Sequence, residues 1–190
     1  MFYPAGGGVT GRFIAIVGPS GVGKDSVMEA MAARDPRLTL ARRVITRPAA
    51  AGGEQFEGIS VAEFEARRDA GQFALWWPAH GLFYGVPTSV DATLQSGCDV
   101  LANLSRTMLE TARTRFLHCE IITLTASRDV LETRLHARGR EGAQAIAGRL
   151  RRSDKTLSQS IPTHRIDNSG PLKQTVGQAL RILYPAPASP

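Results

Sequence analysis

The chain has 190 residues, of which 43% are hydrophobic and 21% are charged, and its formal net charge at pH 7 is +6. This is the composition of an ordinary globular domain, and two cysteines are too few for a disulfide framework. No apolar run approaches the roughly 18 residues of a membrane span and no secretory signal is evident, so we expect one cytoplasmic domain. The positive charge suits nucleic acid, an anionic surface or a small polyanion, and composition alone does not choose among them.

The first predicted strand, residues 12–18, leads into GPSGVGKDS, residues 18–26, and then into a predicted helix over residues 25–34. This context fits the phosphate-loop pattern G-x-x-x-x-G-K-[ST], in which backbone N–H groups and the helix N-terminus bind phosphate and the lysine reaches the β and γ phosphates. We therefore expect nucleotide phosphates to be bound by Gly18, Pro19, Ser20, Gly21, Val22, Gly23, Lys24, Asp25 and Ser26.

Asp25 departs from this pattern because it stands where the magnesium-binding hydroxyl is expected, and a hydroxyl follows only at Ser26. Ser26 could shift to take the metal, or Asp25 could hold Mg²⁺ through water, since carboxylate oxygens suit this hard cation. A third interpretation is that Asp25 only caps the helix. The sequence leaves these three alternatives open.

The middle of the chain, residues 42–90, breaks the alternation of strands and helices, and we interpret it as an inserted substrate-binding lobe. Ser60 and Glu63 form a possible capping box for a helix that ends at Gly71. His80 begins a hairpin-like segment. A structural or surface role is favoured for each of the four histidines, and a functional role is left open for His80 alone. The remaining elements expected here are strands over residues 40–46 and 73–77 and a hairpin over residues 80–86.

Alternation resumes after the lobe, which indicates an α/β fold with a parallel sheet flanked by helices and a core over residues 12–41 and 91–184. Pro171 is expected in the first turn of the closing helix, and residues 185–190 are expected to be disordered. The other elements are strands over residues 98–105, 119–125 and 164–168, helices over residues 106–116 and 129–137, and an arginine-rich helix over residues 142–158.

Arginines gather at two places along the sequence. Arg43 and Arg47 lie on or just after the second strand, and others flank the glycine break near Gly139. A phosphate acceptor is already anionic near neutral pH and needs no general base, so catalysis consists of holding two polyanions together with guanidinium groups and Mg²⁺. The arginines therefore favour a phosphate acceptor over an alcohol.

The chain resembles the guanylate kinase-like branch of the nucleoside monophosphate kinases, a P-loop NTPase fold with an inserted acceptor lobe and an arginine-rich lid, here residues 134–152. The resemblance covers residues 12–183 and is carried by GPSGVGK, by TRP after a basic strand, by FYG and by RLHARGRE. Two acidic base-reading groups of guanylate kinases are missing. Leu75 stands nine residues before Tyr84, where a glutamate is expected, and ANLSR replaces an aspartate-rich segment.

More closely, the chain is similar to the ribose 1,5-bisphosphate phosphokinase family, through GKDS, VITRPAAAGGE, HGLFYGVP, NLSR and RGRE. Leu104 departs from this pattern, because a small glycine is expected there. The resemblance implies transfer of a phosphoryl group from ATP to ribose 1,5-bisphosphate, with Mg²⁺ and with ADP and 5-phosphoribosyl 1-diphosphate as products. The implied partners are these small molecules, without nucleic acid or membrane, and the implied assembly is a monomer or homodimer.

The same resemblance implies roles for individual residues. Catalysis falls to Lys24, Arg47, Arg138 and Arg149. ATP is bound by residues 18–26 and Asn168, the latter near adenine, and Mg²⁺ by Asp25 or Ser26. The acceptor phosphate is bound by Arg43, Arg47 and Tyr84, and the ribose or its second phosphate by Asn103, Ser105 and Arg106, although these sugar-side residues could instead belong to the core or the surface.

Three rival functions remain from the sequence. A GMP kinase is disfavoured by Leu75, and a non-catalytic guanylate kinase-like module is disfavoured by the retained Lys24. A nucleic-acid binder is suggested only by the basic charge, because no nucleic-acid motif is present and the arginines fall where a kinase would bind phosphate.

Overall fold

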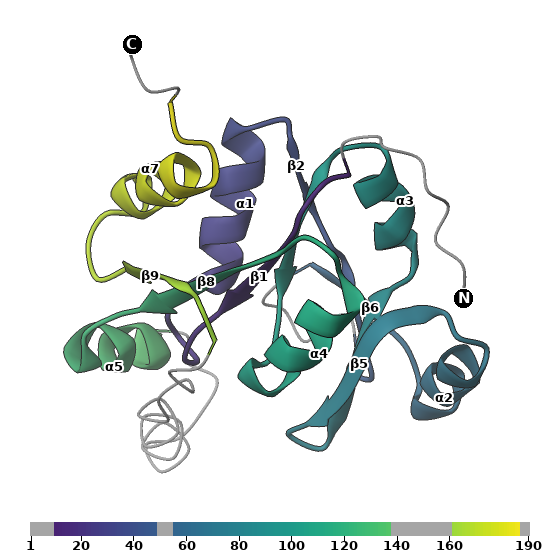
Figure 1. Ribbon diagram of the computed structural model, residues 1–190. Helices are drawn as coiled ribbons and strands as arrows, with labels where there is room; N and C mark the ends of the chain where they lie inside the picture. The colour runs from purple at the N-terminus through teal and green to yellow at the C-terminus, as the bar shows by residue number, and fades with distance from the viewer. Residues whose placement is uncertain (1–9, 49–54, 138–160, 187–190) are drawn as a thin grey trace.

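The structure is a computed structural model that describes residues 10–48, 55–137 and 161–186. Its larger sheet is entirely parallel, in the order β2-β7-β1-β8-β9 (Figure 1). The strands are β1 (Phe13–Val17), β2 (Leu38–Leu40), β7 (Asp99–Asn103), β8 (Cys119–Thr125) and β9 (His164–Asp167). β1 lies between two neighbours and every one of its residues is buried, which explains its unbroken apolar sequence FIAIV. The predicted α/β class with a parallel sheet is confirmed.

Helices cover both faces of this sheet. α1 (Lys24–Arg34), α5 (Arg128–Ala137) and α7 (Leu172–Leu183) pack with Ile14 and Ile16 on one face. α3 (Ser89–Gln95) and α4 (Leu109–Arg115) pack with Phe13 and Ala15 on the other (Figure 1). Successive side chains of β1 thus serve two separate cores, as the strand period of two requires. None of the helices in the described ranges is long and apolar enough to span a membrane.

The smaller sheet has four strands in the order β4-β3-β6-β5 and carries α2 (Val61–Asp69). Its strands are β3 (Arg43–Ile45), β4 (Phe56–Gly58), β5 (Phe73–Ala79) and β6 (Leu82–Pro87). On its outer face Phe64 of α2 stacks on Phe73 with ring centroids 4.5 Å apart. On its inner face Leu75 and Trp77 join the core beneath α3 and α4. The inner face is therefore held against the larger sheet by apolar contacts.

The prediction of one strand over residues 40–46 is wrong, because this stretch contributes to both sheets. β2 ends at Leu40 and pairs with β7, whereas β3 begins at Arg43 and pairs with β4 and β6. Ala41 N still donates to Leu101 O at 2.8 Å, so the chain leaves the larger sheet only after Ala41. The sequence pattern does not reveal this change of partner strand, because the residues of β2 and β3 have the same local propensity for extended backbone.

Three further predictions concern a helix cap, a hairpin and the start of the last helix. Ser60 Oγ accepts a hydrogen bond from Glu63 N at 3.1 Å, which confirms the N-terminal cap of α2. The hairpin is formed by β5 and β6, which pair up to Ala79 and Leu82 and leave a two-residue turn, so the predicted residues 80–86 contain only its turn and most of its second strand. Pro171 is not in the first helical turn as predicted. It has extended backbone, with ψ 133°, and is the N-cap of α7.

The predicted helix over residues 106–116 starts differently from an ordinary α-helix. Its first residues form a 3₁₀ turn, η2 (Arg106–Met108), and α4 follows. The tighter turn begins directly after Ser105, which has extended backbone. The predicted arginine-rich helix over residues 142–158 lies outside the described residues.

Candidate active site

The carboxyl ends of the parallel strands gather the candidate residues at one edge of the larger sheet. The phosphate loop follows β1, Ser105 and Arg106 follow β7, and Asn168 follows β9. Because these strands are parallel and adjacent, their carboxyl ends lie together, and this is the edge where open α/β sheets bind ligands. The sequence motifs that lie far apart along the chain thus meet in one place.

Two glycines shape the phosphate loop. A β-carbon at Gly18 would lie 2.5 Å from Leu124 O, so only glycine lets the loop pass this close to β8. Gly23 has φ +92°, which other residues rarely adopt, and it is the N-cap of α1. Lys24 Nζ donates to the carbonyl oxygens of Gly18 at 3.0 Å and Pro19 at 3.2 Å. The lysine therefore lies over the loop, as a phosphate-binding lysine must.

Asn168 supports the loop from behind. Its Nδ2 donates to Val22 O at 2.7 Å, and its Oδ1 accepts from Thr175 Oγ1 at 2.7 Å. Asn168 is only 3% exposed, so its amide is oriented by the protein itself. The resemblance placed Asn168 near adenine, which stays a prediction, and its described contacts give it a part in holding the loop backbone.

Two further residues act on the same loop and were not among the predicted site residues. Arg134 Nη1 on α5 also donates to Val22 O, at 3.2 Å, and Thr175 on α7 fixes the Asn168 amide. Arg134 is one of the arginines before the glycine break, which is a usable signal in the sequence. Thr175 gives no such signal, because a buried threonine in an amphipathic helix looks like any core position.

Asp25 and Asn103 are brought into direct contact. Asn103 Nδ2, at the end of β7, donates to Asp25 Oδ1, in the first turn of α1, at 2.7 Å. Asn103 is 7% exposed, whereas the next residue after Asp25, Ser26, is on the exposed side of α1. The sequence assigned Asn103 to the sugar and Asp25 to the metal. The structure places them in one hydrogen-bonded pair.

Ser105 and Arg106 lie at the turn between β7 and η2. Ser105 Oγ and Thr107 Oγ1 are 2.9 Å apart and share a hydrogen bond. Burial lowers the pKa of the Arg106 guanidinium from its ordinary value, and the group stays charged at neutral pH. A partly desolvated cation interacts more strongly with an anion than an exposed cation does.

The smaller sheet contributes a guanidinium set among aromatic rings. Arg43 is 7% exposed, and its guanidinium carbon lies 5.3 Å from the ring centroid of Tyr84 and 5.9 Å from that of Trp77. The two rings are nearly parallel, at 9°, with centroids 5.5 Å apart. Arg43 and Tyr84 are both predicted site residues, whereas Trp77 is not, since a tryptophan in a strand reads as core.

Arg47 is placed by the segment that follows β3. Its guanidinium carbon lies 4.3 Å from the ring centroid of Phe56 in β4. The preceding residue, Thr46, accepts a hydrogen bond through Oγ1 from Phe83 N at 2.8 Å. This bond joins the TRP segment to the FYG segment, so the segment that carries Arg47 is held beside β6, which carries Tyr84. The predicted lid residues Arg138 and Arg149 lie outside the described residues.

Magnesium fits the donor set at the phosphate loop. Within the described ranges no three His, Cys, Asp or Glu side chains form a group that could hold a metal ion. Mg²⁺ in phosphoryl-transfer sites is held by one or two carboxylates together with substrate phosphates and water, so Asp25 beside the loop is a sufficient protein contribution.

Comparisons with known proteins agree with this geometry. The guanylate kinase family model matches residues 10–170. The ribose 1,5-bisphosphate phosphokinase PhnN of Ruegeria sp. (strain TM1040) is 45% identical over 174 residues, which cover 91% of this chain and 92% of the relative. The PhnN of Pseudomonas fluorescens (strain SBW25) is 43% identical over 185 residues, covering 92% and 96% of the two chains.

The guanylate kinase of Anaplasma phagocytophilum superposes with a TM-score of 0.61 at 20% identity, covering 93% of this chain and 86% of that one. At this identity the likeness shows the fold alone. It confirms the predicted P-loop, guanylate kinase-like architecture, and together with the family model it identifies the chain as a member of the guanylate kinase family.

Proposed function

We propose that this chain transfers the γ-phosphoryl group of ATP to the 1-phosphate of ribose 1,5-bisphosphate, giving ADP and 5-phosphoribosyl 1-diphosphate. Relatives named ribose 1,5-bisphosphate phosphokinase align over nearly the whole chain. The observation that carries the proposal is the pairing of a phosphate loop that retains its lysine with a guanidinium–aromatic face on the smaller sheet, where the position of a guanine-reading glutamate is held by the buried Leu75.

The donor side is formed by the loop after β1. Its backbone N–H groups and the N-terminus of α1 would bind the ATP phosphates, while Lys24 would bridge the β and γ phosphates. Mg²⁺, bound with Asp25 or Ser26 near it, would supply positive charge to the same oxygens. Asn168 and Arg134 keep Val22 in place, so the loop does not have to reorganise when phosphate arrives.

The acceptor side is formed by the inner face of the smaller sheet. We assign the acceptor phosphate to Arg43, Arg47 and Tyr84, and the sugar or its second phosphate to Ser105 and Arg106. Residues 42–90 act as the acceptor lobe in this proposal, and residues 134–152, with Arg138 and Arg149, as a lid that excludes water.

The reaction needs no general base on the protein. The second pKa of a phosphate monoester is about 6, so the attacking oxygen is already anionic at neutral pH. One oxygen of the 1-phosphate forms a bond to the γ-phosphorus while the bond from that phosphorus to the ADP oxygen breaks, and ADP leaves with the electron pair. Catalysis then consists of orientation and charge neutralisation by Lys24 and the arginines.

GMP is the competing acceptor because the family model that matches this chain is that of guanylate kinase. Reading guanine requires acceptors for its N–H donors, and Leu75 offers none: it is 3% exposed and packs in the apolar core with Trp77. Leaving guanine N–H groups without partners in such a site is costly.

The test is ADP release with three acceptors offered separately: ribose 1,5-bisphosphate, ribose 5-phosphate and GMP. We expect turnover only with the bisphosphate, since ribose 5-phosphate lacks the 1-phosphate that attacks. Comparable turnover with ribose 5-phosphate would mean that the acceptor is a hydroxyl or the 5-phosphate and not the 1-phosphate. Turnover confined to GMP would mean that the base is read in another way.

A further inference from the structure

The hydrogen bond between Asn103 and Asp25 joins the two elements that surround the nucleotide metal in P-loop enzymes. In those enzymes Mg²⁺ is held by the hydroxyl that follows the loop lysine and by an aspartate from a second strand. Here Asp25 follows Lys24 directly, and Asn103 ends the neighbouring strand β7. The carboxylate is therefore on the helix, and the neutral polar group is on the strand.

The charge of the site is preserved by this arrangement, although its location changes. A hydroxyl with an aspartate carries one negative charge, and Asp25 with Asn103 carries one as well. The 2.7 Å bond occupies one oxygen of the Asp25 carboxylate and leaves the other for a water or a cation. Asn103 is 7% exposed, so the amide has little freedom to turn elsewhere.

Ser26 is less suited to the metal on the same geometry. Successive residues of an α-helix are rotated by about 100°, so Ser26 cannot share the direction of Asp25 within an unbroken helix. α1 begins at Lys24, and Ser26 is exposed while Asp25 is half-buried against β7. The side of α1 that faces β7 is thus occupied by the carboxylate.

We propose that Asp25 is the carboxylate that contacts the magnesium of bound Mg·nucleotide, directly or through water, and that Asn103 is the positioning residue that orients it. Asn103 is then not a sugar ligand. The inference rests on the proposed function only in taking Mg·ATP as the donor, and it is independent of which acceptor is used.

The experiment measures ADP binding by calorimetry, without acceptor, in excess EDTA and in excess Mg²⁺. The readout is the Kd for ADP in EDTA divided by the Kd for ADP in Mg²⁺. A larger ratio means that the metal contributes more to binding. Asp25→Asn removes the charge at constant shape, and we expect the ratio to fall about 10-fold or more. In EDTA, ADP should bind as tightly or more tightly, since a carboxylate facing bare phosphates repels them.

Asn103→Leu removes only the orienting bond, and the ratio should fall by about 10-fold or less. The matched rescue is the double variant Asp25→Ser with Asn103→Asp, which restores the usual hydroxyl and strand carboxylate. It should recover most of the ratio lost in Asp25→Ser alone. Binding of Mn²⁺ and ADP, followed by the electron paramagnetic resonance of free Mn²⁺, should give the same order of variants.

Two results would overturn the inference. The first is an unchanged ratio in Asp25→Asn, which would mean that the carboxylate does not act on the metal; if both dissociation constants also rise equally, Asp25 supports the helix start instead. The second concerns the double variant. A double variant no better than Asp25→Ser would contradict the exchange between helix and strand. Wild-type protein that binds no ADP under either condition would contradict the proposed function itself.

Discussion

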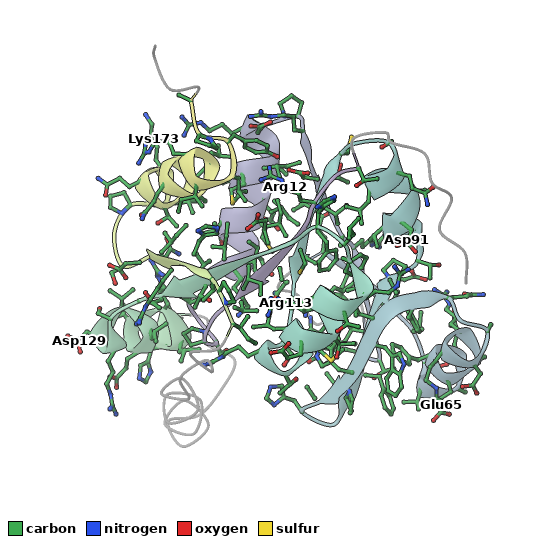
Figure 2. The ribbon with its side chains drawn as sticks, viewed as in Figure 1. Arg12, Glu65, Asp91, Arg113, Asp129 and Lys173 are labelled. Atoms are coloured by element: carbon green, nitrogen blue, oxygen red, sulfur yellow. The ribbon has the colours of Figure 1, made fainter. Side chains whose placement is uncertain are left out.

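The two edges of the larger sheet both carry arginines, and they use them differently. Arg12, which is labelled in Figure 2, lies at the amino edge, directly before β1. It pairs with Asp99 at 2.7 Å and donates to Leu183 O at 2.9 Å. Tyr184 completes this cluster by donating to Asp99 Oδ2 at 2.7 Å. At the carboxyl edge, Lys24 Nζ donates to the carbonyl oxygens of the phosphate loop, and on the neighbouring smaller sheet the Arg43 guanidinium lies near the rings of Tyr84 and Trp77.

The partners of the basic residues distinguish those with a structural role from those that we assign to ligands. A guanidinium that meets its own carboxylate, as Arg12 does, has little left to offer an anion. The basic side chains on the carboxyl side are the ones that the proposed function assigns to ligand phosphates. We therefore expect substitutions at the amino edge to lower the free energy of unfolding without changing kcat. Substitutions on the carboxyl side should lower kcat or raise a KM with little change in stability.

The largest expected effect is at the carboxyl edge. Lys24→Met keeps the length of the side chain but removes the charge that serves the β and γ phosphates. We expect kcat to fall by about 10²–10³-fold or more, as when a central electrostatic donor is removed. The thermal midpoint should stay close to that of the wild type. Near-normal turnover in a folded variant would contradict the assignment of the loop.

The next effect is at the amino edge. Asp99→Asn leaves Arg12 without its carboxylate, and we expect a loss of about 3 kcal/mol in the free energy of unfolding, since Asp99 is only 6% exposed. Denaturant titration measures the loss, and kcat should be unchanged. A fall in kcat that exceeds the fall in folded fraction would break the division between the two edges.

The same aspartate predicts a pH dependence. Burial acts to raise the pKa of Asp99, but hydrogen bonds from Arg12 and Tyr184 and the charge of Arg12 outweigh it and hold the pKa below its ordinary value. A lowered folded-state pKa means that the stabilisation is complete above the unfolded pKa, about 3.9, and is lost as the pH falls through the folded pKa. The stability difference between wild type and Asp99→Asn should therefore shrink only below about pH 4. A constant difference down to pH 2 would contradict the pairing.

A smaller effect is expected at the acceptor face. Arg43→Lys keeps the positive charge but loses the planar group that lies against Tyr84 and Trp77. We expect the KM for the acceptor to rise by about 10-fold, with the KM for ATP unchanged. An equal rise for both substrates would show that Arg43 supports the general architecture rather than the acceptor.

The smallest effect concerns the hairpin of the acceptor sheet. His80 has φ 55° and Gly81 has φ 73°, so the two-residue turn needs positive φ at both positions. Asparagine before glycine is favoured in this turn, and His80→Asn should stabilise the protein by about 0.5 kcal/mol without changing turnover. A clear loss of turnover would give His80 a functional role.

Features built from residues that are close together in the sequence could be predicted from the sequence. The phosphate loop is continuous, from Gly18 to Lys24, and its strand-to-helix context is visible in the apolar pattern on either side. The cap at Ser60 and the β5–β6 hairpin are local for the same reason.

The parts that depend on distant pairing were not recoverable. The change of sheet after Ala41 is decided by which strand lies alongside, and the hydrogen bonds of Asn103 and Asn168 by which loop lies opposite. A single sequence does not specify such partners. The resemblance assigned both asparagines to ligands, which stays a prediction, and the structure adds the contacts of Asn103 with Asp25 and of Asn168 with Val22.

The most direct test of the account is phosphorus NMR of the protein with Mg·ATP and ribose 1,5-bisphosphate, beside an identical sample that contains GMP. If the chain is a ribose 1,5-bisphosphate kinase, a new pair of coupled diphosphate signals, distinct from those of ADP, appears in the sugar sample alone. A nucleoside diphosphate formed from GMP, with no change in the sugar sample, would contradict it and would require a guanine-reading group that Leu75 does not provide.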